Sequence, residues 1–150
     1  MIFIRMFGFL WCIGAAAIGA WFAVMALDNE APFHYLSEAE GSHITPNPVH
    51  PEGKVSTHWI LTEIKKDCPR QIERIYYNRD TGELVTTQDA TPLSQVTKGS
   101  PTKLSRSFDL PPGLPTRSDY QAKACFQCNF LQMFFPLCAV SPKLSINILE

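Results

Sequence analysis

The chain has 150 residues and a formal net charge of −1, from 13 basic and 14 acidic side chains. A nucleic-acid binder needs a basic surface that displaces phosphate counterions, so this balance argues against nucleic acid as a partner. The length allows one domain of roughly 100 residues and an appendage.

The N-terminal stretch Ile2–Leu27 is apolar and carries a single charge, at Arg5. As a helix, residues 6–27 would be about 33 Å long, against a hydrocarbon core of about 30 Å. Acidic residues follow the stretch, and the next basic residue is Lys54. The positive-inside rule therefore predicts a single-pass transmembrane signal-anchor helix over residues 1–27, with the N-terminus in the cytoplasm and the C-terminal domain periplasmic or extracellular.

A cleaved signal peptide is the alternative for this stretch, because Val24-x-Ala26 offers small residues at the spacing of a cleavage site. The apolar run is longer than the roughly 7–15 residues of a signal-peptide core, which favours an uncleaved anchor. Whether the segment is cleaved stays open.

Small residues recur every four positions along the predicted helix, a spacing that lets two membrane helices approach closely. This pattern predicts self-association into a homo-oligomer, or packing against a protein partner in the membrane or envelope. The alternative is that small residues are simply common in membrane helices. The two rows are Gly8, Cys12, Ala16 and Ala20, and Ala15, Gly19 and Ala23.

Residues 28–42 are acidic and show no strand periodicity, so they are predicted to form a tether. From residue 43 onward, short strand patterns alternate with turn signals. The clearest is Ser118–Cys128, where apolar and polar residues alternate and predict one face on a core. The expected strands are 44–53, 54–65, 71–77, 83–87, 102–110, 118–128 and 143–149, with a loop over 88–101. The prediction is a mainly β fold, an antiparallel sandwich of about seven strands over residues 43–150.

The order of these strands resembles an immunoglobulin or fibronectin type III domain. The resemblance rests on the Pro-x-Pro-Val-x-x-x-Gly pattern at 46–53, on Trp59 within a long second strand, and on Asp119-Tyr120 opening the penultimate strand. It covers residues 43–150 and implies an Ig-like β-sandwich. The spacing departs from antibody domains, in which the buried tryptophan lies on the third strand.

Four cysteines lie within residues 43–150. In an oxidising compartment, four cysteines suggest two disulfides, with three allowed connectivities. The Ig-like resemblance implies that the loops holding Cys68 and Cys128 lie at the same end, so Cys68–Cys128 is the preferred pair. Cys125 is predicted to point outward, which leaves Cys125–Cys138 open as a second pair.

The segment 130–137 carries large apolar side chains where a loop should be polar. Such a patch marks a protein or membrane contact, unless the residues fold back over the end of the core. The residues of this predicted interaction loop are Phe130, Leu131, Met133, Phe134, Phe135 and Leu137.

No catalytic motif, cofactor site or metal-ligand spacing is evident, and His34, His43, His50 and His58 form no metal-binding pattern. The protein is therefore predicted to be a membrane-anchored extracytoplasmic interaction module and not an enzyme. A thiol redox or metal-binding protein using Cys125-x-x-Cys128 is the alternative. The sequence Cys125-Phe126-Gln127-Cys128-Asn129, with Phe135-Pro136-Leu137, is similar to small anchored bacteriophage proteins, which implies a phage or envelope accessory role.

Overall fold

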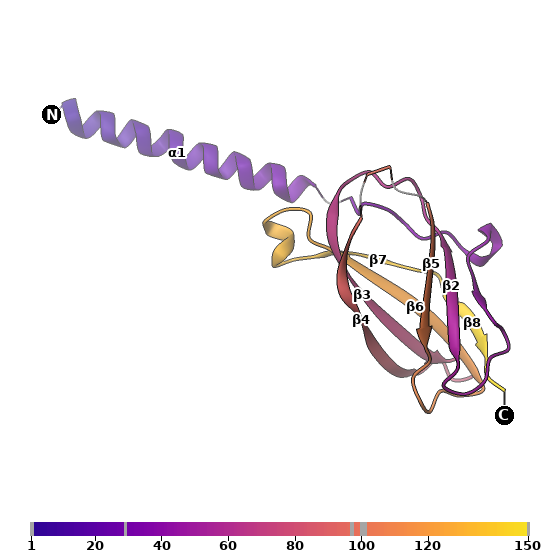
Figure 1. The fold of residues 1–150 in the computed structure, drawn as a ribbon. Helices are drawn as coiled ribbons and strands as arrows, with labels where there is room; N and C mark the ends of the chain where they lie inside the picture. The colour runs from indigo at the N-terminus through magenta and orange to yellow at the C-terminus, as the bar shows by residue number, and fades with distance from the viewer. Residues whose placement is uncertain (1, 29, 97, 100–101, 150) are drawn as a thin grey trace.

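Figure 1 shows the computed structural model, which describes residues 2–28, 30–96, 98–99 and 102–149, with the side chains of residues 2–10, 12 and 89–96 left undescribed. A helix precedes a domain built of strands. Its elements, in chain order, are α1 (Ile2–Leu27), the 3-10 helix η1 (Glu38–Glu40), β1 (His43–Thr45), β2 (Lys54–Ile60), β3 (Cys68–Asn78), β4 (Leu84–Val96), β5 (Lys103–Asp109), β6 (Arg117–Phe126), the 3-10 helix η2 (Leu131–Met133), β7 (Leu137–Val140) and β8 (Leu144–Asn147).

The described part of the chain forms two antiparallel sheets. The smaller sheet has the order β1-β2-β5, and the larger has β4-β3-β6-β7, with β8 also paired to β6. The mainly β class is as predicted. The prediction of an Ig-like sandwich of about seven strands behind a membrane helix is corrected to eight strands in sheets of three and five. The additional strand is β7, which follows η2 and pairs with the last four residues of β6, Lys123–Phe126.

The core lies between the two sheets, where alternating side chains of facing strands meet. In β6 every second residue from Ser118 to Phe126 is buried, which matches the alternation in the sequence. On the smaller sheet, Val55, Thr57 and Trp59 are buried in the same manner. Tyr120 stands at the centre, with ring neighbours on both sheets. Period-two patterning therefore sets which faces are inward.

The hairpin of β3 and β4 is longer than the sequence suggested. Its turn lies at 78–82 as predicted, with Gly82 at φ 74° and the Asn78 side chain accepting the backbone N–H of Asp80 at 2.9 Å. Beyond the turn, β4 continues to Val96, so strand replaces most of the loop expected over 88–101. The chain there lacks the Gly and Pro signals that would end a strand, except at Pro92.

The segment expected to be a tether over 28–42 instead packs on the domain along part of its length. Leu36 donates its N–H to the Ile60 carbonyl at 2.8 Å, and Thr62 donates to the His34 carbonyl at 2.9 Å. Phe33 is 1% exposed and lies edge-on to Phe126, with ring centroids 5.1 Å apart. The physical reason is that an aromatic side chain gains more from burial than a short flexible segment gains from chain entropy.

The predicted membrane anchor is corrected by the described residues. Among the described residues, no helix combines the length and the apolarity needed to cross a membrane. The transmembrane signal-anchor over residues 1–27, the single-pass location and the assignment of cytoplasmic and periplasmic or extracellular sides are therefore not retained.

Candidate functional site

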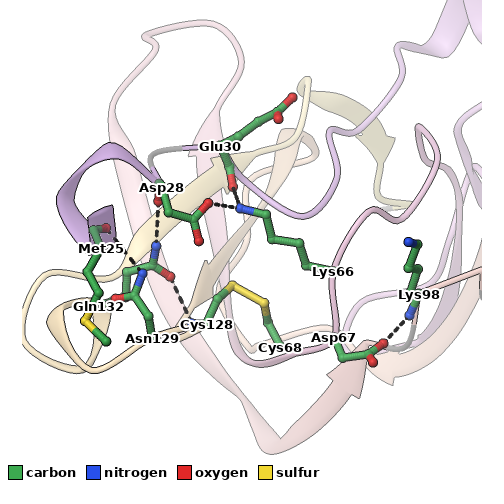
Figure 2. The surroundings of a disulfide bond; sticks show 10 residues. All are labelled: Met25, Asp28, Glu30, Lys66, Asp67, Cys68, Lys98, Cys128, Asn129 and Gln132. Atoms are coloured by element: carbon green, nitrogen blue, oxygen red, sulfur yellow. Dashed lines mark hydrogen bonds and ion pairs between the residues drawn. A yellow bond between two sulfur atoms is a disulfide. The ribbon is translucent and has the colours of Figure 1, made fainter. Parts of the chain in front are cut away.

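The end of α1 meets the loop between β6 and β7 at one end of the domain (Figure 1). We call this region the junction and define it as residues 25–28, 30, 65–68 and 128–132. Figure 2 shows Gln132 and Asn129 pointing from the loop toward the last residues of the helical segment. The junction is built from three stretches that are far apart in sequence, so it fixes how α1 and the loop stand relative to the sheets.

Gln132 is the central polar side chain of the junction and is 4% exposed. Its Nε2 donates to the Asp28 carbonyl at 2.9 Å, and its Oε1 accepts the backbone N–H of Cys128 at 2.9 Å. The backbone N–H of Gln132 in turn donates to Asn129 Oδ1 at 3.0 Å. Asn129 Nδ2 reaches the Met25 carbonyl at 3.5 Å. These amides satisfy carbonyls that a helix end leaves without intrahelical partners.

Ion pairs hold the other side of the junction. Lys66 pairs with the Asp28 carboxylate and also donates to the Glu30 carbonyl at 3.4 Å. Lys65 pairs with the Glu30 carboxylate, whose pKa is lowered by the Lys65 hydrogen bond and charge. These pairs are partly exposed, so each contributes little stability by itself. Their role is to orient the segment after α1 toward the start of β3.

Two disulfides flank the aromatic loop. Cys68 is joined to Cys128 with a Cα–Cα distance of 4.7 Å, and Cys125 is joined to Cys138 at 4.0 Å. These are the preferred pair and the second pair of the sequence analysis. Cys68 is the first residue of β3, whereas the sequence placed it in the preceding loop. Cys125 and Cys138 face each other directly across β6 and β7.

The aromatic loop, residues 130–135, projects most of its apolar side chains into solvent. Phe134 is 66% exposed and Phe135 is 77% exposed, and Phe130 and Met133 are exposed as well. Leu131 and Leu137 are half-buried. Phe130 and Phe134 stack edge-on at 5.4 Å. Four of the six residues singled out from the sequence therefore do not fold back over the core.

The small residues predicted for helix packing are exposed where they are described. A Cβ added at Gly19 would meet no atom within 4 Å. The described members of the two rows are Ala15, Ala16, Gly19, Ala20 and Ala23, while the side chains of Gly8 and Cys12 lie outside the described residues. Because the membrane-spanning helix is corrected, the homo-oligomer and the membrane or envelope partner predicted through that helix are not retained.

The Cys125-x-x-Cys128 pair is not bonded to itself, because each cysteine is bonded to a distant partner. Within the described residues, no group of three or more His, Cys, Asp or Glu side chains could hold a metal ion. His43 and His58 stack at 4.7 Å across β1 and β2, a contact that the sequence did not suggest.

Sequence reasoning missed the polar residues that hold the aromatic loop. The available signal was Gln132, the single polar residue within an otherwise apolar run. A polar side chain in such a run indicates a hydrogen bond that holds the loop. Asp28 and Lys66 gave no signal, because their contact joins positions 38 residues apart.

Comparisons with known proteins do not assign the chain to a family. No family model matches the chain, and no curated protein matches it. Among solved structures, the chain is similar to the alkylpurine DNA glycosylase AlkC of Pseudomonas fluorescens, solved bound to DNA containing an abasic-site analogue. The identity is 10%, the TM-score is 0.48, and the alignment covers 85% of this chain and 33% of that chain. The chain thus spans about a third of that protein's length.

Two predictions are not retained, namely that the protein is not an enzyme and that it has no nucleic-acid partner. The likeness to this neighbour carries no argument about the activity or ligand of this chain. None of the comparisons points to a bacteriophage protein or an Ig-like family, and those resemblances are not carried further.

Replacing Gln132 by Ala is expected to lower the free energy of unfolding by about 1–3 kcal/mol, because the Cys128 N–H and the Asp28 carbonyl lose a buried partner. Chemical denaturation measures the change. Gln71→Ala on exposed β3 surface is the matched control and should change stability by less than about 0.5 kcal/mol. Equal effects of both substitutions would refute the role given to Gln132.

Proposed function

We propose that the chain is a protein-interaction module whose contact surface is the aromatic loop, residues 130–135. The observation that carries the proposal is the exposure of Phe130, Met133, Phe134 and Phe135 on one loop. Large exposed apolar patches on soluble surfaces mark contact sites, and aromatic and Met side chains are enriched in protein interfaces.

The support around the loop favours binding over accidental exposure. Gln132 fixes the loop backbone from within, and a disulfide lies on each side of the exposed side chains. A loop held in one conformation loses less entropy when a partner binds, which is the benefit of preorganisation. A flexible loop with the same composition would instead collapse onto the nearest apolar surface.

The two disulfides favour an oxidising compartment as the place where the module folds. Disulfides form and persist in oxidising compartments and are rare where thiols are kept reduced. The alternative of a thiol redox protein needs Cys125 and Cys128 bonded to each other in the oxidised form. Since each is bonded elsewhere, no observation favours that alternative.

Site-specific photo-crosslinking in the native host tests the proposal. A photoreactive phenylalanine analogue at Phe135 should give a discrete protein adduct, whereas the same analogue at Leu84, which is exposed on β4, should give none. Adding the change Phe134→Ser should remove the adduct by deleting its neighbouring anchor. Adducts at both positions, or at neither, would contradict the proposal.

The double variant Phe134→Ser/Phe135→Ser separates binding from folding. Both side chains are mostly exposed, so the free energy of unfolding should change by less than about 0.5 kcal/mol per residue. Chemical denaturation checks this expectation. A loss of several kcal/mol would mean that the loop serves the core instead of a partner.

A further inference from the structure

The two disulfides differ in their access to solvent. Cys68 is 2% exposed, and Cys128 is half-buried against the core. Figure 2 shows their bond among the residues of the junction. The Cys68–Cys128 bond is therefore enclosed by the domain on the side of Cys68.

The Cys125–Cys138 bond lies on the outer face of the larger sheet. In β6 the neighbours of Cys125, Ala124 and Phe126, are both buried, so the Cys125 side chain points away from the core. In β7 Ala139 is buried, whereas Cys138 is exposed. A reagent in solution therefore reaches this bond without any opening of the core.

The direction of the bond decides which of its two sulfurs a nucleophile can attack. In a thiol–disulfide exchange the attacking sulfur approaches along the line of the bond that breaks, so access to the far side of each sulfur matters. Beyond Cys138 this line leads to the free edge of β7, where no further strand is paired among the described residues. Beyond Cys125 it leads to β3, where Gln71 lies directly opposite Cys125. Cys138 therefore carries the accessible sulfur.

The surroundings of the two sulfurs favour the same direction of attack. Attack on Cys138 leaves the negative charge on Cys125 Sγ, and Lys123 lies two residues before Cys125 on the same face of β6. A nearby cation favours a thiolate, although Lys123 also pairs with Glu73 at 3.4 Å. Attack on Cys125 would instead leave the charge on Cys138 Sγ, which lies 3.8 Å from the Pro136 carbonyl oxygen. Because that oxygen repels a thiolate, Cys125 is the better leaving group.

We propose that Cys138 is a site of reversible addition for a low-molecular-weight thiol. The thiolate of the small molecule attacks Cys138 Sγ and forms a new S–S bond, while the bond to Cys125 breaks with its electron pair on Cys125 Sγ. The Cys125 thiolate takes a proton from water, and its attack on the mixed disulfide reverses the step. The exchange needs no external oxidant, because one disulfide replaces another.

The addition also has a consequence for the aromatic loop. Cys138 lies three positions after Phe135, so the added group is attached close along the chain to the surface proposed for contact. This consequence rests on the proposed function, whereas the exchange at Cys138 does not.

Reaction of the full chain with reduced glutathione, followed by mapping of the modified peptides, tests the site. The change Cys12→Ser leaves only the four bonded cysteines in the readout. After a quench with excess N-ethylmaleimide, mass spectrometry should find glutathione on Cys138 at least about tenfold more often than on Cys125, with maleimide on Cys125. The Cys68–Cys128 bond should stay intact. No adduct, an equal or larger share on Cys125, or an equally early adduct on Cys68 or Cys128 would overturn the proposal.

Two further variants make the test specific. Lys123→Gln removes the cation beside the leaving sulfur and should slow the formation of the adduct by about twofold or more. Lys103→Gln, on the smaller sheet, is the matched control and should leave the rate unchanged. Equal rates in these two variants would refute the role given to Lys123. Phe134→Ser/Phe135→Ser should also leave the rate unchanged, so a failure of the contact surface and a failure of the thiol site can be told apart.

Discussion

Replacing Phe33 by Ala is expected to lower the free energy of unfolding by about 3–5 kcal/mol, the usual cost of removing a buried aromatic side chain. Phe33 precedes β1, yet its side chain is almost fully buried in the core. Its ring lies edge-on to Phe126 at 5.1 Å and to Tyr35 at 5.4 Å, and the Arg70 guanidinium lies 5.7 Å from its centroid. Urea denaturation of the full chain measures the loss.

The Phe33→Ala experiment discriminates between two descriptions of residues 28–42. A free tether would lose nothing on truncation of Phe33, whereas a segment packed on the core would lose the full value. Phe134→Ala is the matched control, since it makes the same chemical change at a largely exposed site and should cost less than about 0.5 kcal/mol. A Phe33→Ala variant as stable as this control would show that the segment does not serve the core.

The local alternation of apolar and polar residues accounts for much of the fold prediction. The alternation in Ser118–Cys128 predicted β6 and its inward face, and the turn residues 78–82 predicted the hairpin. The packing of Phe33 could not be predicted, because it joins the segment before β1 to Phe126, far along the chain. Strand β7 was missed because Leu137–Val140 is only four residues long and directly follows Pro136, so it shows no alternation of its own.

The sequence predicted which residues make up the exposed loop, but not which contacts hold it in place. An apolar run between two strands pointed to residues 130–137, and four of its members are exposed. What holds the loop in place depends on contacts between distant segments, such as Gln132 with the Asp28 carbonyl. The contact of Arg74 on β3 with the Phe108 ring on β5 was not predictable for the same reason. The two strands belong to different sheets, and nothing in their local sequence indicates that they face each other.

Removal of the Cys68–Cys128 disulfide is expected to have the other large effect on stability. The bond closes a loop of 60 residues, and loop-closure entropy predicts a loss of about 4 kcal/mol on its removal. Removal of Cys125–Cys138, which closes a loop of 13 residues, should cost about 3 kcal/mol. The two double variants, Cys68→Ala/Cys128→Ala and Cys125→Ala/Cys138→Ala, are compared by chemical denaturation.

The two disulfide variants should also differ in how they affect the aromatic loop. Cys128 is bonded to β3 and donates its N–H to Gln132, so loss of Cys68–Cys128 loosens the attachment of the loop to the domain. Cys125 and Cys138 lie on strands that remain paired through their backbone, so loss of their bond leaves the loop ends together. Hydrogen exchange at the amides of Gln132 and Phe134 should therefore accelerate more in the first variant than in the second. The reverse order would mean that the ladder between β6 and β7, and not the attachment to β3, keeps the aromatic loop in place.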